Sequence, residues 1–311
     1  MRNAWVVGAL IGLALAGSLW AATHTEFQAV NAAGESTYTA AQTVTLEGIV
    51  LNNPADMLDP TPDDANVQMY NIVGQWQLFF QGEGDDLAGT ALYMGQMYSN
   101  LPWISPDGGY SNEEWVAELT RLNAAQFSVG DRIRATGYFL SYKGKTNINE
   151  QHNDNPDHDF TIELIQKGVG LPKPEVVTLD DLKDDQDQFI FDPARLVGGE
   201  RYQSRLIKIE GVSIADPNGW GPYGELTITD GVKTLPVWLG RGTGIYAGSY
   251  NLNEVIDVIG ILDQESTALV DGYRLLVLNY DGNGEVLAAP DHRRADEVVE
   301  EPVEEQPVLE Q

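Results

Sequence analysis

The chain contains no cysteine and few basic side chains. Among its 311 residues, 18 Lys and Arg stand against 47 Asp and Glu, which gives a formal net charge of −29 at pH 7. Without cysteine there are no disulfides and no lipoprotein attachment, so core packing alone must stabilise the fold. A field this negative repels nucleic-acid phosphates and anionic membrane surfaces and attracts divalent cations. Nucleic acid is therefore a disfavoured partner.

The sequence also lacks the common catalytic motifs. It has no G-x-S-x-G elbow, no G-x-x-x-x-G-K-[ST] phosphate loop and no H-E-x-x-H helix. Its histidines are His24, His152, His158 and His292. General-base chemistry would therefore depend on carboxylates, which are too abundant here for any pair to be informative. We expect a protein that is not an enzyme.

Both ends of the chain differ in composition from the rest. Residues 5–16 are almost entirely apolar and 17–22 include several small residues, which is typical of a signal peptide over residues 1–22. This predicts export to the periplasm, the cell surface or the medium, without stable membrane insertion after cleavage. The alternative is an uncleaved anchor. Residues 289–311 are acidic and lack Phe, Trp and Tyr, which predicts a disordered tail.

The chain does contain an internal repeat. VTLEGIV (44–50) returns as IKIEGVS (207–213), and RIRATGYF (132–139) returns as VIDVIGIL (255–262). Gly48 and Gly137 lie 89 residues apart, whereas Gly211 and Gly260 lie 49 apart. The repeat predicts one β domain in two copies, and the difference of 40 residues predicts an insertion in the first copy.

Alternation of apolar and polar residues predicts strands in both copies, and in the first copy it places Gly48 and Gly137 on the inward face. The first copy has strands at 43–51, 74–81, 90–98, 132–142, 145–150 and 160–166. The second has them at 206–213, 224–229, 232–239, 254–263 and 272–278. Ser111 as N-cap and the apolar face of Trp115, Leu119 and Leu122 predict a helix over 112–123. The expected units are a domain over 36–167, a linker over 168–201 that packs partly on the second barrel, and a domain over 202–288.

The strand order, with LEGIV and IEGVS as first strands and GDRIRATGYF and NEVIDVIGIL as fourth strands, resembles the OB-fold. The chain is similar to the accessory OB domains found beside bacterial secreted nucleases and phosphatases, but it carries no catalytic module. The resemblance implies an all-β fold with a minor helix, built as two tandem OB-fold-like five-stranded Greek-key barrels. It also implies binding faces flanked by the loops after the first and fourth strands.

Aromatic and basic residues near these loops are the candidate ligand contacts, because rings stack on bases or sugars. They are Trp220, Tyr223, Trp238 and Arg241 in the second copy, and Tyr142, Lys143 and Lys145, a local basic spot, in the first. The alternative for Trp220 and Tyr223 is that they cover the end of the barrel. Core or cover positions are expected for Trp76, Phe79, Phe80, Tyr93 and Trp103.

The densest polar segment is NEQHNDNPDHDF (149–160). Its candidate metal ligands are His152, Asp154, Asp157, His158 and Asp159. The carboxylates suit Ca²⁺ and the two histidines suit a transition metal, although the spacing matches no established loop. The alternative is a solvated acidic loop. No other cofactor is indicated.

These observations leave three functions. The first is an exported, non-catalytic binding or adaptor protein whose barrel loops bind a glycan, a peptide or a surface protein. The second is an extracellular nucleic-acid or nuclease accessory protein, which the fold suggests and the net charge opposes. The third is a metal-dependent hydrolase at the acidic loop.

Overall fold

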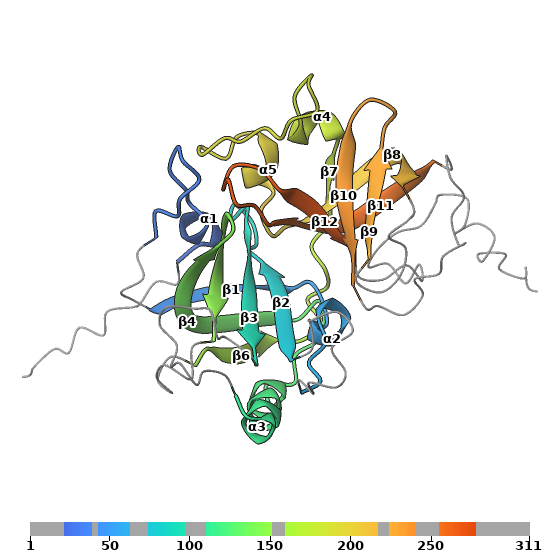
Figure 1. Cartoon of the computed structure of the whole chain (residues 1–311). Helices are drawn as coiled ribbons and strands as arrows, with labels where there is room; N and C mark the ends of the chain where they lie inside the picture. Colours follow the sequence, from blue (N-terminus) through green and yellow to red (C-terminus); the bar gives the residue numbers. More distant parts are fainter. Residues whose placement is uncertain are drawn as a thin grey trace, which may run out of the picture.

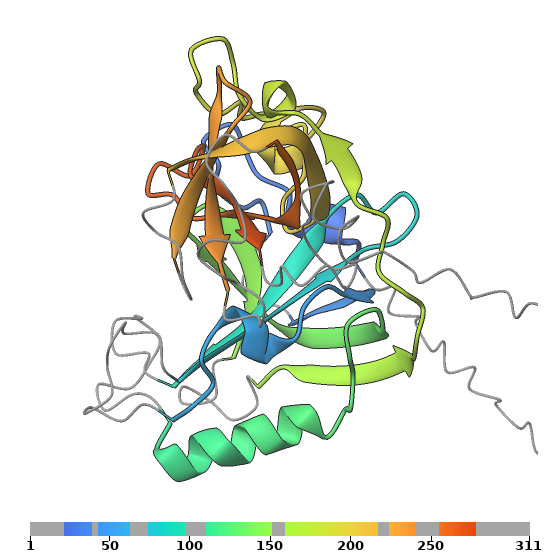
Figure 2. The ribbon, with the colours of Figure 1, turned by 90° about the vertical axis from the view of Figure 1, so that its right-hand side faces the viewer.

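The computed structural model describes residues 22–38, 43–62, 74–96, 110–150, 159–216, 224–240 and 255–277. Most of these residues lie in two closed barrels, joined by the segment between β6 and β8 (Figure 1). In both views the second barrel is stacked on one side of the first, and helix α3 lies on the opposite side (Figures 1 and 2). Within the described residues, no helix has the length and hydrophobicity needed to cross a bilayer.

The first barrel closes through five strands in the order β1-β2-β3-β5-β4 and back to β1. Its strands are β1 (Thr43–Val50), β2 (Gln75–Gln81), β3 (Gly89–Gly95), β4 (Arg132–Tyr142) and β5 (Lys145–Asn149). All neighbours are antiparallel except β3 and β5. A sixth strand, β6 (Thr161–Gln166), pairs with the first half of β4 and extends the sheet.

The second barrel repeats this arrangement in the order β8-β9-β10-β12-β11 and back to β8. Its strands are β8 (Leu206–Asp216), β9 (Glu225–Thr229), β10 (Thr234–Leu239), β11 (Ile256–Gln264) and β12 (Tyr273–Val277). The single parallel pair is again between the third and fifth strands, β10 and β12. The predicted all-β fold of two tandem five-stranded barrels is confirmed.

The repeat extends to the hydrogen-bond register. Val44 lies opposite Gly137 in the first barrel, and their counterparts Ile207 and Gly260 lie opposite each other in the second. Gly137 faces inward as predicted: a Cβ there would lie 2.5 Å from Ile148 Cγ2. The packing leaves no room for a side chain at this position.

Gly211, the counterpart of Gly48 in the second barrel, does not face inward. This residue is exposed, has φ of +70°, and a Cβ there would meet nothing within 4 Å. The pairing of β8 with β11 shifts between Ile256 and Val258, and Gly211 N donates to Asp257 Oδ1 at 3.2 Å. Gly211 therefore serves a β-bulge, where a positive φ favours glycine.

The extra residues of the first copy are spread over several connections rather than forming one insertion. The link from β1 to β2 covers 51–74 and contains α2 (Pro54–Met57), against 217–224 in the second copy. The link from β3 to β4 covers 96–131 and contains α3 (Asn112–Asn123), against 240–255. Ser111 caps α3, accepting from Glu114 N at 3.2 Å. Trp115 and Leu122 of α3 join the barrel core.

The segments outside the barrels also pack against them. Helix α1 (His24–Phe27) places Phe27 in the core of the first barrel. Between the barrels, β7 (Glu175–Val177) pairs in parallel with β8, and α4 (Leu179–Leu182) and α5 (Gly198–Arg201) follow. Val177, Leu179 and Leu182 belong to the second core. Much of the linker is therefore part of the second barrel's packing.

Candidate functional site

The structure describes only some of the predicted site residues. Those outside the described residues are Trp220, Tyr223, Arg241, His152, Asp154, Asp157 and His158. Those within them are Tyr142, Lys143, Lys145, Trp238 and Asp159. Tyr142, at the end of β4, is exposed. The other four fall into three places: the contact between the barrels, the outer face of the second barrel, and the side of the first barrel covered by α3.

The predicted basic spot lies against the second barrel. Lys143 lies in the turn between β4 and β5, and Lys145 begins β5; their ammonium groups pair with Glu265 and Asp263 respectively. Lys143 O also accepts from Ser266 N at 2.8 Å. Only 5% of the Lys145 side chain is exposed. These lysines join the barrels, and Lys145 has no surface to offer a ligand.

Asp263 is the centre of a buried ion network at this contact. It lies between Lys145 and Arg274, and Arg274 also reaches Glu265 at 2.7 Å. Burial alone would raise the pKa of Asp263, but Lys145 and Arg274 outweigh it and hold that pKa below its usual range. The carboxylate is therefore charged in the folded protein, and its cations come from both barrels.

A hydrophobic cluster completes the contact. The first barrel contributes the outward-facing side of β2 and β3 together with α2, and the second contributes β8, β11 and β12. Its buried members are Leu51, Met57, Leu58, Phe79 and Ala91 from the first barrel, and Leu206, Ile261 and Leu276 from the second. Trp76 and Phe80 instead point into the first core. The outer face of β2 and β3 is thus buried under the second barrel.

The corresponding outer face of the second barrel, on β9 and β10, is not buried in this way. Its residues are Glu225, which is exposed, and Thr227, Thr229, Thr234, Pro236 and Trp238, which are half-buried. The guanidinium of Arg274 lies 4.9 Å from the centre of the Trp238 ring, a favourable cation–π distance. Trp238 stands where this face meets the contact between the barrels.

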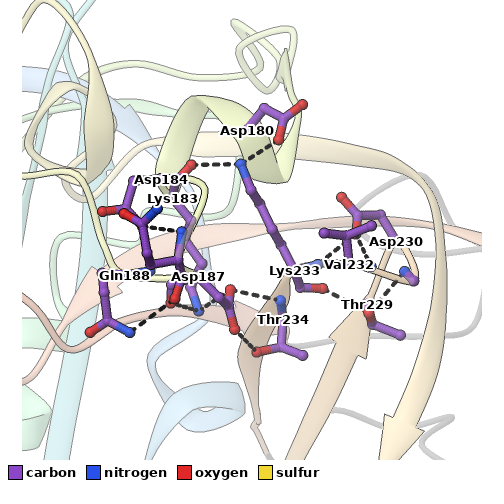
Figure 3. Close-up of polar contacts among 12 residues, drawn as sticks. Asp180, Lys183, Asp184, Asp187, Gln188, Thr229, Asp230, Val232, Lys233 and Thr234 are labelled. Carbon is purple, nitrogen blue, oxygen red and sulfur yellow. Dashed lines mark hydrogen bonds and ion pairs between the residues drawn. The ribbon is translucent and has the colours of Figure 1, made fainter.

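The linker holds the hairpin between β9 and β10 at its turn (Figure 3). Lys233 Nζ donates to Asp180 and, at 2.8 Å, to Lys183 O. Asp187 accepts from Thr234 N at 3.1 Å and from Thr234 Oγ1 at 2.9 Å. These bonds fix one end of the β9–β10 face. The face is therefore anchored at the hairpin turn, independently of the first barrel.

Asp159 belongs to a cluster of carboxylates on the first barrel. Oxygen atoms of Glu118 on α3, Glu150 after β5 and Asp159 before β6 lie within 4.8 Å of one another. Arg121 Nε donates to Glu118 Oε1 at 2.6 Å. Glu118 was not identified from the sequence, because it stands in no recognisable motif, and Glu150 was not among the candidates although it lies in the polar segment 149–160. We call Glu118, Glu150 and Asp159 the carboxylate cluster.

Strand order, closure and the single parallel pair define the class: each barrel is OB-like, and the chain is a tandem of two. No family model and no curated protein matches the sequence.

Two solved structures show a distant likeness. One, described as "Structural mimicry for functional antagonism", has 9% identity and a TM-score of 0.30, covering 77% of this chain and 93% of that one. The other is a replication protein A heterotrimer bound to ssDNA, with 10% identity and a TM-score of 0.27, covering 80% of this chain and 52% of that one. Neither likeness is close enough to support an argument about function.

Proposed function

We propose that the chain is an exported, non-catalytic binding or adaptor protein, and that its second barrel presents the ligand-binding face. One observation carries this proposal. The outer face of β2 and β3 is buried between the barrels, whereas the equivalent face of β9 and β10 is half-exposed and bears Trp238. OB-like barrels bind ligands on this face. The first barrel then acts as a support that fixes the second.

The chemistry of the β9–β10 face favours an uncharged ligand. Threonine hydroxyls and an indole ring suit a glycan, because the ring stacks on a sugar and hydroxyl groups exchange hydrogen bonds with it. Arg274 faces Trp238 but is paired with Asp263 and Glu265, so its charge is already balanced. Glu225 adds a negative charge at the edge of the face. A glycan therefore fits this face better than a nucleic acid.

The nucleic-acid accessory role is the second candidate, since OB-like barrels also bind single strands. It requires cations, which supply most non-specific affinity for phosphates. Lys143 and Lys145 were the local candidates, and both are paired with carboxylates of the second barrel. This observation favours the glycan role over the nucleic-acid role.

Glycan-array screening of the full chain, followed by titration of the best ligand, tests the proposal. Trp238→Ala should weaken binding by about 5- to 150-fold, equivalent to about 1–3 kcal/mol for a stacked ring. Thr227→Arg, in the middle of the face, should weaken it without touching a core. Thr161→Arg, on an exposed position of β6, is the matched control and should bind normally.

Unaltered affinity in both Trp238→Ala and Thr227→Arg would refute the assignment of the face. Micromolar binding to single-stranded DNA at moderate salt, weakened by Thr227→Glu, would favour the accessory role instead.

A further inference from the structure

The carboxylate cluster is assembled by three separate elements of the first barrel. Glu118 is on α3, in the connection that the second copy replaces with a shorter segment, while Glu150 and Asp159 flank residues 151–158. Helix α3 is held to the barrel by Trp115, whose Nε1 donates to Pro60 O at 2.6 Å. Next to Asp159, Phe160 stacks on Trp76 with ring centres 5.7 Å apart. Packing therefore fixes the cluster in place.

One carboxylate oxygen in the cluster accepts no hydrogen bond from a donor in the part of the chain that the structure describes. Glu150 is fully buried, and its Oε2 accepts from Phe160 N at 3.0 Å. Its Oε1 is buried with no hydrogen bond to any described residue. A buried carboxylate oxygen without a donor or cation carries a large desolvation penalty. Glu150 is thus a buried acceptor in need of a positively charged or protonated partner.

Arg121 meets only part of this need. Its guanidinium binds Glu118, donates from Nη2 to Phe160 O at 2.8 Å, and lies 3.6 Å from Glu150 Oε2. One guanidinium neutralises one of the three negative charges. Within the part of the chain that the structure describes, the cluster therefore brings together more carboxylates than Arg121 can balance.

We propose that Glu118, Glu150 and Asp159 form a Ca²⁺ site on the first barrel. Two oxygens that bind Ca²⁺ at about 2.4 Å from opposite sides are about 4.8 Å apart, and the three carboxylates fall within that limit. Oxygen-only ligands favour a hard cation over zinc or copper. Ca²⁺ tolerates irregular geometry and completes its shell with water, whereas Mg²⁺ demands a near-ideal octahedron. The site is separate from the proposed β9–β10 face, so either assignment can fail alone.

Terbium luminescence locates the ion. Tb³⁺ replaces Ca²⁺ and emits when a nearby tryptophan is excited, and Trp115 lies one helical turn before Glu118. The full chain should give tryptophan-sensitised emission that saturates at one ion per molecule and is displaced by Ca²⁺. Glu150→Gln should abolish this emission. Glu113→Gln, an exposed residue of the same helix, removes the same charge and should leave it unchanged.

Thermal unfolding gives an independent readout. At Ca²⁺ 100-fold above Kd, the Tm of the wild-type chain and of Glu113→Gln should rise by about 5–10 °C. The Tm of Glu150→Gln should not rise. Without Ca²⁺, Glu150→Gln should be at least as stable as the wild type, because a neutral amide avoids the cost of a buried carboxylate and its NH₂ group can donate to a neighbouring carboxylate. If Glu150→Gln fails to fold by circular dichroism, Asp159→Asn, expected to weaken Ca²⁺ at least ~10-fold, takes its place.

Equal responses of the wild type and the cluster variants would show diffuse binding to an acidic surface and overturn the proposal. So would the absence of any Tm rise in the wild type. Mg²⁺ producing the same stabilisation at the same concentration would overturn the preference for Ca²⁺.

Discussion

Replacing Lys145 with methionine should destabilise the whole chain by breaking the ion network between the barrels. Lys145 and Asp263 are 5% and 1% exposed in their side chains. Removing one partner of a buried pair costs about 3–5 kcal/mol, because the other charge stays buried. Arg274 still contacts Asp263, which places the expected loss near 3 kcal/mol. This corresponds to a fall in Tm of roughly 6–12 °C.

Denaturant unfolding of the full chain measures this loss, and a double-mutant cycle tests its cause. Asp263→Leu alone should also destabilise, because it leaves Lys145 buried without its partner. The double variant Lys145→Met with Asp263→Leu should be more stable than either single variant, because an apolar pair removes both buried charges. Lys173→Met, at an exposed position, is the control and should change stability by less than about 0.5 kcal/mol.

A change below about 0.5 kcal/mol in Lys145→Met would refute the reasoning. Strict additivity in the double variant would refute the coupling. Loss of ligand affinity in Lys145→Met with unchanged stability would restore Lys145 as a ligand contact.

Three further predictions concern the first barrel and the bulge in the second. His24 is buried beside Phe80, and burial lowers its pKa to about 4 although Asp86 and Glu47 O oppose this. The unfolded chain then binds one more proton, so stability should fall by about 3 kcal/mol as the pH drops from 6.5 to 4. Urea unfolding at several pH values should show a shallower decline in His24→Gln, and parallel profiles would contradict this. Gly137→Asn should unfold more easily than Gly137→Ala, since a Cβ already meets Ile148. Gly211→Asn should be more stable than Gly211→Ala, since asparagine accepts a positive φ; the reverse order at either site would be incompatible with the structure.

The repeat was predictable from the sequence because a strand with one buried face shows an alternation of apolar and polar residues within a few positions. Val44, Gly137, Ile207 and Gly260 occupy matching places in matching patterns, and their pairing follows from the barrel topology. Helix α3 was also predictable, down to its ends, because Ser111 and the apolar face are local signals. Features set by neighbours within a few residues are those that sequence patterns reveal.

The contact between the barrels was not predicted, because its partners are distant in sequence. Lys145 resembles a surface lysine until Asp263, 118 residues later, is placed against it. One signal was available: β2 reads QWQLFFQ, with Phe79 among the inward-facing Trp76, Leu78 and Phe80. An apolar residue on each side of a strand indicates burial of both faces. Glu150 stands in the polar segment 149–160, but its proximity to Glu118 depends on how α3 packs on the barrel.

The two barrels touch through different surfaces, and this has a consequence for assembly. When two similar barrels join through different faces, each barrel keeps an unused copy of the face that its partner used. Contacts of this kind can continue head to tail from one molecule to the next and form filaments. Here the unused copies have diverged. By strand register, the contact residues of the second barrel correspond to mostly polar residues of the first: Leu206 to Thr43, Ile259 to Thr136, Ile261 to Tyr138 and Leu276 to Asn149. In the same way, the contact residues Phe79 and Ala91 of the first barrel correspond to Thr227 and Pro236 of the second. Growth from one molecule to the next would have to bury hydroxyl and amide groups in place of leucine and isoleucine. The divergence of the unused faces thereby works against further growth, and it leaves the proposed β9–β10 binding face outside the contact between the barrels.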